Sequence, residues 1–406
     1  MAGGKNIKST VKNFPRFEFK GGLGPFRWGG MHLDGDPSSI PVNQPRIIIN
    51  GRIEDGVIRN RAGLAKLDAS AVGDSANCIG AIAALDPPPL RIYFITNYCS
   101  GGLGCTIYLA DSELDNEIQI AGKIYAQVAH NVVLGKYGQY LYVSSKGRLM
   151  RFDPQQIPYG VSNPGSGIVA DVIFDFGLGK DIAFIQEFGG LLFIGVNDVG
   201  GDDRVYSYDG VTVAAELSAA GPLGQGTCLY RDLMVFGYTT TNKITYRTAD
   251  GTYTDVVPGA GTLPDPIAML SWQDNVYIVG STTSIWLFTG TAVSSVRTIA
   301  TAVNFKGLAE LRGQLFFAYN EAASARIGKY DGANWTNVEK NLTAQFSNVP
   351  ELGGMVSYRE RLAVTARIDP ASPSLYFSDG FVTNGSWAGT NPSLTPAGLA
   401  YSPIVV

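Results

Sequence analysis

Histidine and cysteine are scarce in this chain, which has 2 and 4 of them among 406 residues. The two histidines, His32 and His130, lie far apart in the sequence, so we expect neither a Ser/His/Asp triad nor a histidine-rich metal centre. The sequence also lacks a Gly-x-Ser-x-Gly elbow and a phosphate-binding Gly-x-x-x-x-Gly-Lys-Ser/Thr loop. These absences predict a protein that is not an enzyme, with no catalytic residues, no metal and no cofactor.

The cysteines are too few for a disulfide scaffold. Cys78 and Cys228 show no metal-ligand spacing. Only Cys99 and Cys105 are close in sequence, where they flank Ser-Gly-Gly-Leu-Gly at the expected tip of a hairpin. They could form a cross-strand disulfide, and two free thiols are the alternative for a protein made in a cytoplasm.

The chain also has few charged residues and few long apolar runs. Charged residues make up only 16% of the chain, and the longest apolar candidate, Ile79–Ile95, is interrupted by Pro87–Pro89, so we expect no membrane span. Lys5 and Lys8 are not followed by an apolar run, so we expect no secretory signal peptide and synthesis in the cytoplasm. The low charge indicates that much of the exterior faces other protein.

Glycine and aromatic residues are abundant by contrast, at 50 residues and 11%, which is typical of a turn-rich all-β protein. The clearest pattern is Ile182–Gly195 followed by Arg204–Gly210, where apolar and polar residues alternate into a Gly-containing turn and then into Asp209-Gly210. Such a pattern predicts two hairpins. It recurs in Val133–Val143 with Gly147–Asp153, Gly226–Gly237 with Lys243–Gly251, Ile267–Gly280 with Ser284–Gly290, Gly307–Tyr319 with Arg326–Gly332 and Gly354–Val364 with Ser374–Gly380, and more loosely in Ile79–Asp111.

The copies follow one another at a regular period. The first core residues after each first turn lie 39 to 51 residues apart, and they are Ile92, Tyr140, Leu191, Leu233, Val276, Leu315 and Leu362. Four strands cannot bury their apolar faces alone, so seven copies predict a seven-bladed β-propeller of four-stranded blades. A β-sandwich is the alternative. We attribute the Asp of the Asp-Gly turns, at Asp209, Asp331 and Asp379, to the positive φ angles that such turns require.

The sequence divides into three predicted parts. They are an extended N-terminal arm at 1–45, a β-hairpin lead-in segment at 46–67 and the propeller at 68–406. The arm is rich in Gly and Pro but carries Phe14, Phe17, Phe19, Phe26 and Trp28, which a free tail would not expose to water. Residues 1–50 hold seven basic and three acidic residues, so their net charge is +4, which leaves −8 on the remainder of a chain whose total is −4. We expect the arm to bind a neighbouring copy around a ring. Folding back onto its own propeller is the alternative.

The lead-in segment carries a resemblance to a known family. Asn50 ends an extended stretch, Gly56 follows in a hairpin turn on Asp55-Gly56, and Arg61 and Gly63 precede the first blade. This arrangement, followed by seven blades, resembles the propeller proteins of bacteriophage tails, notably the nozzle or tail-hub proteins of short-tailed phages. The resemblance implies a structural protein of the virion. The chain departs from that family because it has no evident platform domain between blades and has a long N-terminal arm.

Three patterns with chemical potential have simpler explanations. Acidic residues such as Asp181, Glu187 and Glu310 lie near the expected strands, but the sequence does not pair them as a glycosidase requires. Segment 378–387 is similar to the Asp-box of sialidases, yet Tyr330-Asp-Gly-Ala-Asn-Trp335 fills the equivalent place, which favours a plain turn. Segment 197–203 offers several oxygens for Ca²⁺, and an ordinary loop is the favoured interpretation.

Two functions of different classes follow. The first is a structural component of a bacteriophage virion, in the tail, nozzle or head-to-tail region, with other copies and neighbouring virion proteins as partners. The acidic body disfavours specific nucleic-acid binding but is compatible with passage of phage DNA without attraction. The alternative is a carbohydrate-binding or carbohydrate-cleaving propeller that recognises a host receptor through Tyr and Trp side chains.

Overall fold

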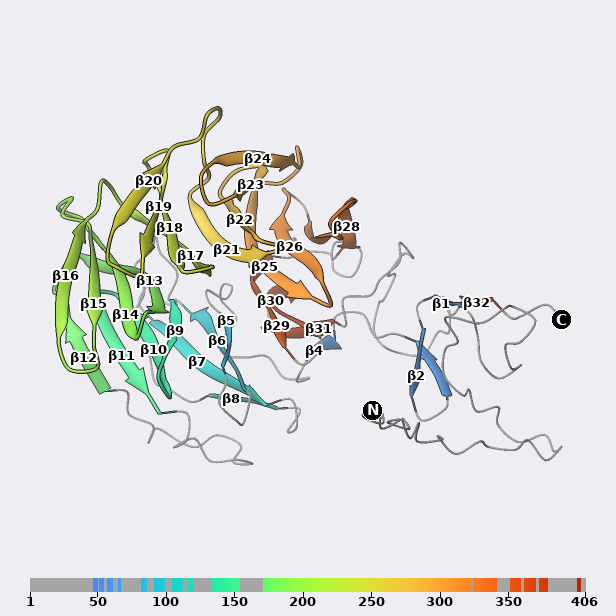
Figure 1. The fold of residues 1–406 in the computed structure, drawn as a ribbon. Coiled ribbons are helices and arrows are strands. Elements are labelled where there is room, and N and C mark those ends of the chain that lie inside the picture. The colour runs from blue at the N-terminus through green and yellow to red at the C-terminus, as the bar shows by residue number, and fades with distance from the viewer. Residues whose placement is uncertain are drawn as a thin grey trace, which may run out of the picture. The chain divides into compact units, whose positions relative to one another are not determined.

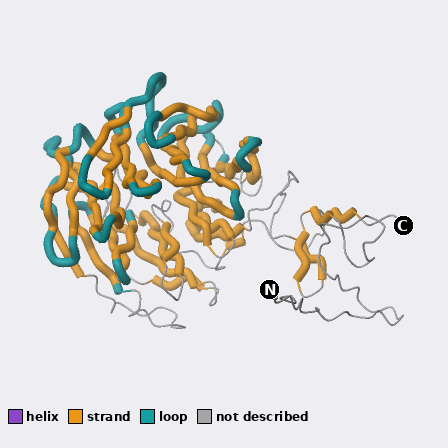
Figure 2. The backbone as a smooth tube through the Cα atoms, viewed as in Figure 1, coloured by secondary structure: helices purple, strands orange, loops and turns teal. Residues whose placement is uncertain are grey.

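The computed structural model describes residues 133–153, 171–322, 324–341, 351–358, 361–369 and 372–378, together with the segments 47–49, 51–54, 57–60, 65–66, 82–85, 91–98, 104–111, 116–119 and 400–402. Every regular element in these ranges is a β-strand (Figure 1, Figure 2). Within the same residues, no helix is long and apolar enough to cross a membrane. The all-β class expected from the sequence is confirmed.

The strands form four-stranded antiparallel sheets in which consecutive strands are neighbours. The β5 sheet contains β5 (Ile82–Leu85), β6 (Arg91–Tyr98), β7 (Gly104–Asp111) and β8 (Asn116–Gln119). The β9 sheet contains β9 (Leu134–Tyr137), β10 (Tyr140–Ser145), β11 (Arg148–Phe152) and β12 (Asp171–Asp175). The β13 sheet contains β13 (Lys180–Phe188), β14 (Leu191–Asp198), β15 (Arg204–Tyr208) and β16 (Val213–Ser218).

Further along the chain the same order repeats. The β17 sheet contains β17 (Leu223–Tyr230), β18 (Leu233–Tyr238), β19 (Ile244–Thr248) and β20 (Tyr253–Val256). The β21 sheet contains β21 (Pro266–Trp272), β22 (Asn275–Gly280), β23 (Ser284–Phe288) and β24 (Val293–Thr298). The β25 sheet contains β25 (Asn304–Leu311), β26 (Gln314–Asn320), β27 (Ala325–Tyr330) and β28 (Trp335–Asn341).

These boundaries agree with the repeat seen in the sequence. The residues expected to begin the second strand of each copy lie at its first or second position: Ile92 in β6, Tyr140 in β10, Leu191 in β14, Leu233 in β18, Val276 in β22, Leu315 in β26 and Leu362 in β30 (Arg361–Asp369). The prediction of antiparallel four-stranded repeats is therefore confirmed at the level of individual strands.

The sheets bury their apolar faces against one another, which a single sheet cannot do. Phe184 of β13 and Phe236 of β18, for example, lie with ring centroids 5.4 Å apart in a core that the β13 and β17 sheets share. The first strands of the sheets contact one another in a cycle: β5, β9, β13, β17, β21, β25, β29 (Glu351–Tyr358) and back to β5. Figure 1 shows these first strands gathered toward the middle of the sheets. The arrangement is that of a propeller-type fold.

The sheet that contains β29 is completed from the other end of the chain. Its order is β29, β30, β31 (Ser372–Ser378) and β4 (Ala65–Lys66), with Tyr376 opposite Lys66 and Phe377 opposite Ala65. The expectation that every copy supplies all four strands of its own sheet does not hold for this last sheet. The physical reason is that β4, which comes before the first sheet in the sequence, pairs with β31 of the last sheet, so that hydrogen bonds connect the two ends of the cycle.

The chain divides into two compact units, Ala62–Thr395 and a second unit made of Met1–Arg61 with Pro396–Val406. The first unit contains the four-stranded sheets. The second contains β1 (Ile47–Ile49) paired with β32 (Ala400–Ser402), and the hairpin of β2 (Gly51–Glu54) with β3 (Val57–Asn60). The paired strands β2 and β3 stand on either side of Asp55-Gly56 in the sequence, where a hairpin turn is predicted.

The outer hairpins turn on Asp-Gly, and the aspartate has a different role from the one expected. The positive φ angles belong to the glycines, 101° at Gly210 and 96° at Gly332, and not to Asp209 or Asp331. Each aspartate instead accepts hydrogen bonds from the two backbone N–H groups that follow the glycine, at 2.6 to 2.8 Å. Such side-chain acceptance is what makes Asp favourable at a turn. Asp379 lies outside the described residues.

Candidate functional site

The first strands of five sheets contain a β-bulge at the same place. In β13, β21, β25 and β29 one extra residue interrupts the pairing with the second strand, and in β17 the interruption spans Gly224–Gly226. The bulged residues are Ala183, Gln225, Ile267, Lys306 and Gly353. A bulge redirects a side chain and bends its strand. Its recurrence next to the axis indicates that the innermost surface of the sheets is specifically shaped.

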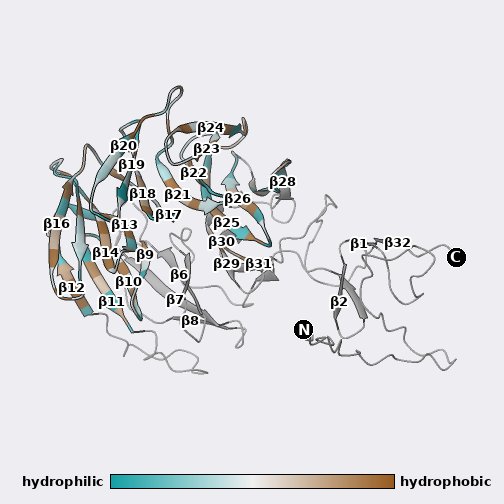
Figure 3. Ribbon diagram, viewed as in Figure 1, coloured by the Kyte–Doolittle hydropathy of each residue, from teal (hydrophilic) through white to brown (hydrophobic). Residues whose placement is uncertain are grey.

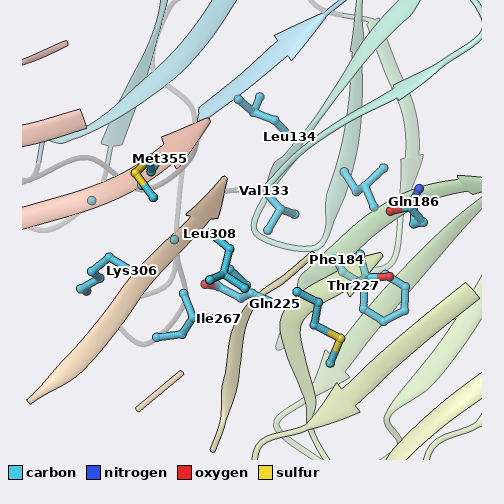
Figure 4. A pocket seen from close by; sticks show the side chains of 17 residues that line it. Val133, Leu134, Phe184, Gln186, Gln225, Thr227, Ile267, Lys306, Leu308 and Met355 are labelled. Carbon is cyan, nitrogen blue, oxygen red and sulfur yellow. The ribbon is translucent and has the colours of Figure 1, made fainter. Parts of the chain in front are cut away.

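Four of the bulged residues line one cavity, and they are Gln225, Ile267, Lys306 and Gly353. The cavity has a volume of about 260 Å³, and residues from β9, β13, β17, β21, β25 and β29 contribute to its wall. We call it the axial cavity because these are the strands of the contact cycle. Figure 4 shows its side chains converging from neighbouring strands.

Glycines beside the bulges bring the first strands close together. A Cβ atom on Gly307 would lie 2.9 Å from the backbone nitrogen of Met355 on the next first strand. A Cβ atom on Gly226 would lie 3.1 Å from side-chain atoms of both Met269 and Pro266. A side chain at either position would crowd the neighbouring first strand, so glycine allows the first strands to approach this closely.

Most of the described residues that line the axial cavity are apolar or glycine, but polar atoms, including backbone ones, make up the larger part of its exposed surface. Its polar side chains are Gln186, Gln225, Thr227 and Lys306. The Gln186 side-chain nitrogen donates to the Glu187 carbonyl at 3.0 Å, and the Thr227 hydroxyl donates to the Val235 carbonyl at 2.9 Å. Among the described residues of the wall, Lys306 alone carries a charge.

Asparagine side chains connect neighbouring sheets. Asn197 in β14 donates to the Leu223 carbonyl at 3.0 Å and accepts from the Leu223 N–H at 2.7 Å. Asn320 in β26 makes the same two bonds with Leu352 of β29, at 3.4 and 3.0 Å. In each case the amide replaces a backbone partner across the gap between two sheets. Both asparagines are buried, so the bonds fix the relative position of the sheets.

Asn242, in the loop after β18, repeats this contact at an exposed position, where it bonds Gly261 and Leu263 at 3.0 and 2.8 Å. These asparagine contacts were not predicted from the sequence. Their only signal was an Asn at or near the end of a second strand, as in Gly195-Val-Asn197 and Ala318-Tyr-Asn320.

A second candidate site is an apolar surface on an outer strand. Val172 and Phe174 of β12 expose 53% and 38% of their surface, and Leu178 in the following turn is fully exposed. The Phe174 ring lies 4.8 Å from that of Phe176. We call Val172, Phe174, Phe176 and Leu178 the β12 patch. Among the described residues, β12 is the last strand of its sheet and no strand pairs with its outer edge. Figure 3 colours this strand by hydropathy.

Charged pairs mark the two ends of β12. Asp171 pairs with Arg151 at 3.0 Å and Asp175 pairs with Arg148 at 2.9 Å. All four side chains keep some exposure to solvent. An apolar centre with polar ends is the usual composition of a surface that binds another protein.

Most of the site residues predicted from the sequence lie outside the described residues. These are the arm residues Phe14, Phe17, Phe19, Phe26 and Trp28, the lead-in residues Asn50, Gly56, Arg61 and Gly63, and Cys99. Cys105 lies in β7 opposite Asn97. The disulfide, the lead-in motif and the role of the arm stay predictions. Cys228 is buried in β17, and burial raises the pKa of its thiol to about 12.

The acidic residues singled out from the sequence do not form a pair within the described chain. Asp181 and Glu187 lie near opposite ends of β13, six residues apart, which corresponds to roughly 20 Å along a strand. Glu310, on β25, accepts a hydrogen bond from the Gly313 N–H at 3.2 Å in its own hairpin turn. Their positions therefore correspond to strand ends and a turn.

The loop considered for Ca²⁺ uses its carboxylates internally. Asp203 accepts a hydrogen bond from the Asp198 N–H at 2.8 Å, and Asp198 pairs with Lys180. Asp202 pairs with Arg204 at 2.9 Å. The hydrogen bond from Lys180 is the main reason that the pKa of Asp198 is lowered. The loop is explained by these bonds without an ion.

Comparison with known proteins bears on the fold. No protein family and no curated protein matches this sequence. A solved streptogramin B lyase is 12% identical with a TM-score of 0.54, over 78% of this chain and 96% of that one. Virginiamycin B lyase from Staphylococcus aureus is 12% identical with a TM-score of 0.54, over 76% and 97%. YCF48 bound to D1 peptide is 10% identical with a TM-score of 0.48, over 82% and 100%. At such identities the likeness concerns the fold alone, and this chain has a propeller-type all-β fold.

Proposed function

We propose that residues 62–395 form a closed, seven-bladed β-propeller. The proposal is supported by the four-stranded sheets that begin with β5, β9, β13, β17, β21, β25 and β29, and by the cycle of contacts among those first strands. The pairing of β4 with β31 would close the ring. An experimentally determined structure with fewer than six blades, more than eight blades, or two packed sheets would contradict it.

We further propose that the protein is a structural component of a bacteriophage virion, in the tail, nozzle or head-to-tail region. It assembles as a ring with other copies through its N-terminal arm, contacts neighbouring virion proteins, and performs no catalysis. The lead-in motif supports this proposal because its last residue, Gly63, stands two positions before β4 in the sequence.

The observation that carries the proposal is the match between the β12 patch and the arm. The arm contains Arg16-Phe-Glu-Phe-Lys20, and β12 reads Asp171-Val-Ile-Phe-Asp175. An antiparallel pairing of the two would place Phe residues beside Val172 and Phe174, with a basic residue beside each terminal aspartate. Backbone pairing on an open edge with complementary side chains is a common mode of binding between chains. The arm of one copy therefore suits the β12 edge of the next.

The size of the axial cavity restricts the path that DNA would take in such an assembly. A volume of about 260 Å³ is far too small for a duplex. Passage of phage DNA without specific binding would therefore occur through the centre of the ring of copies. The DNA would pass along residues 51–406, whose net charge is −8 because residues 1–50 carry +4 and the whole chain carries −4.

The proposal is tested by particle assembly. Deletion of residues 1–40, and the double change Val172→Ser with Phe174→Ser, should each leave a folded protein that is missing from purified particles when counted by mass spectrometry. Val296→Ser is the matched control, because Val296 is an exposed apolar residue on β24, the outer strand of another sheet. It should be incorporated normally.

Normal incorporation of the arm deletion would contradict assembly through the arm. Absence of the wild-type protein from particles would contradict the virion assignment as a whole. Binding or turnover of host polysaccharides by the purified protein would instead support the carbohydrate-directed alternative.

A further inference from the structure

Lys306 is placed in the axial cavity by the bulge in β25. Its neighbours Phe305 and Gly307 pair with consecutive residues of β26, so Lys306 is the extra residue and lines the cavity. The side chain is partly buried. Within the described part of the chain, its ammonium group has no hydrogen-bond or ion-pair partner.

Lys306 is partly buried beside apolar side chains, where its ammonium group would gain from a counter-charge. Removing a charge from water carries a cost that is normally offset by a counter-charge or by hydrogen bonds. Two other partly buried lysines have such a partner, since Lys180 pairs with Asp198 and Lys243 pairs with Asp255. No described residue in the wall of the axial cavity supplies a carboxylate for Lys306. The cavity therefore has an unmatched positive charge.

The rest of the wall indicates what kind of anion would fit. Ile267, Leu308 and Met355 give the cavity an apolar surface near Lys306 (Figure 4). Gln225 and Thr227 add polar atoms on β17, which is separated from β25 by β21 in the contact cycle. A single cation beside apolar side chains suits a monoanion with a short apolar body. A phosphate group, which carries more charge, is usually bound by several cations or N–H donors.

The volume limits the ligand to a small molecule. A water molecule occupies about 30 Å³ in the liquid. The cavity of about 260 Å³ therefore has room for about nine such volumes, or a ligand of about ten non-hydrogen atoms at most. We propose that the axial cavity binds a small aliphatic carboxylate, which forms an ion pair with Lys306 and packs its apolar part against Ile267, Leu308 and Met355.

The experiment compares hexanoate with hexanamide, which has nearly the same shape and no charge. The full-length protein is titrated with each, and binding is followed by ligand-observed NMR and by the shift in melting temperature. Hexanoate should bind about tenfold more tightly than hexanamide, which corresponds to one charge-assisted hydrogen bond. Lys306→Met should remove this difference. Lys136→Met is the matched control, because Lys136 lies on the first strand β9 but outside the axial cavity, and it should keep the difference.

Several results would overturn the assignment. Equal binding of hexanoate and hexanamide to the wild type would exclude a role for charge, and this comparison decides the matter even if Lys306→Met fails to fold. Retention of the hexanoate preference in Lys306→Met would place the ligand elsewhere. Inorganic phosphate binding as tightly as hexanoate would indicate a general anion site, and absence of hexanoate binding up to its solubility limit would reject the proposal. None of these outcomes depends on whether the protein belongs to a virion.

Discussion

The paired hydrogen bonds of Asn197 provide a quantitative test of how neighbouring sheets are held together. Asn197→Ala removes one bond to the Leu223 carbonyl and one from the Leu223 N–H. Leu223 is fully buried, so water cannot replace the lost partner. A hydrogen bond contributes about 1 kcal/mol net, and a buried polar group left without a partner costs about 1 to 3 kcal/mol. We therefore expect the free energy of unfolding to fall by about 2 to 4 kcal/mol.

Asn242 offers a matched control within the same protein. It makes the same two kinds of bond, but its side chain is exposed and its bond from the Leu263 N–H is only partly buried, so water can replace the amide more readily. Asn242→Ala should therefore cost less than about 1 kcal/mol. Asn320→Ala should resemble Asn197→Ala, toward the lower end of the range, because its bond to the Leu352 carbonyl is 3.4 Å long.

The measurement is urea unfolding followed by tryptophan fluorescence, with the difference in stability taken from the shift in midpoint at unchanged slope. If Asn197→Ala and Asn242→Ala lowered stability equally, burial of the amide would not be the source of its contribution. If neither variant changed the midpoint, the asparagine contacts would not hold the sheets together at all.

Three further predictions concern single residues. Backbone hydrogen bonds to Asp209 lower its pKa, so their stabilising effect is complete above the ordinary pKa of about 3.9 and is lost as the pH falls through the lowered value. Asp209→Asn should therefore flatten the acid limb of a pH–stability curve. An unchanged acid limb would contradict this. Cys228, with its buried thiol and raised pKa, should resist alkylation in the native protein and react only in urea, as peptide mass mapping would detect. Gly307→Ala should lower the free energy of unfolding by about 1 to 3 kcal/mol, because the new Cβ atom would crowd the next first strand. Gly259→Ala is the control, because a Cβ atom there would have no neighbour within 4 Å, and it should be neutral or slightly stabilising. Thermal unfolding would measure both variants.

The repeat could be predicted from the sequence because its signals are local. Leu233 and Val276 follow short polar turns and begin apolar runs, so each marks the start of a second strand without any knowledge of its neighbours. The Asp-Gly turns were found for the same reason. The role of Asp209 was misjudged because the dipeptide does not reveal which of its two residues adopts the positive φ angle.

The axial cavity could not be predicted because it depends on contacts between sheets. In Phe305-Lys-Gly307, the lysine would be expected to alternate outward in a regular strand, and only the bulge, set by the pairing with β26, places it in the cavity wall. The contact of Asn197 with Leu223 likewise joins residues of different sheets. The strand β4 has two residues, too few for any periodic pattern to identify.

The pairing of β4 with β31 has a mechanical consequence. Tension applied to the two ends of the chain would enter Ala62–Thr395 beside these two strands, the first and the last described strands of that unit in sequence. Their pairing covers two residue pairs, whereas β13 and β14 are paired over eight. A pulling force would therefore separate β4 from β31 first, while the long internal hairpins stayed intact. The force needed to separate the two strands would depend on β4, which has only two residues, and lengthening β4 would raise it most effectively.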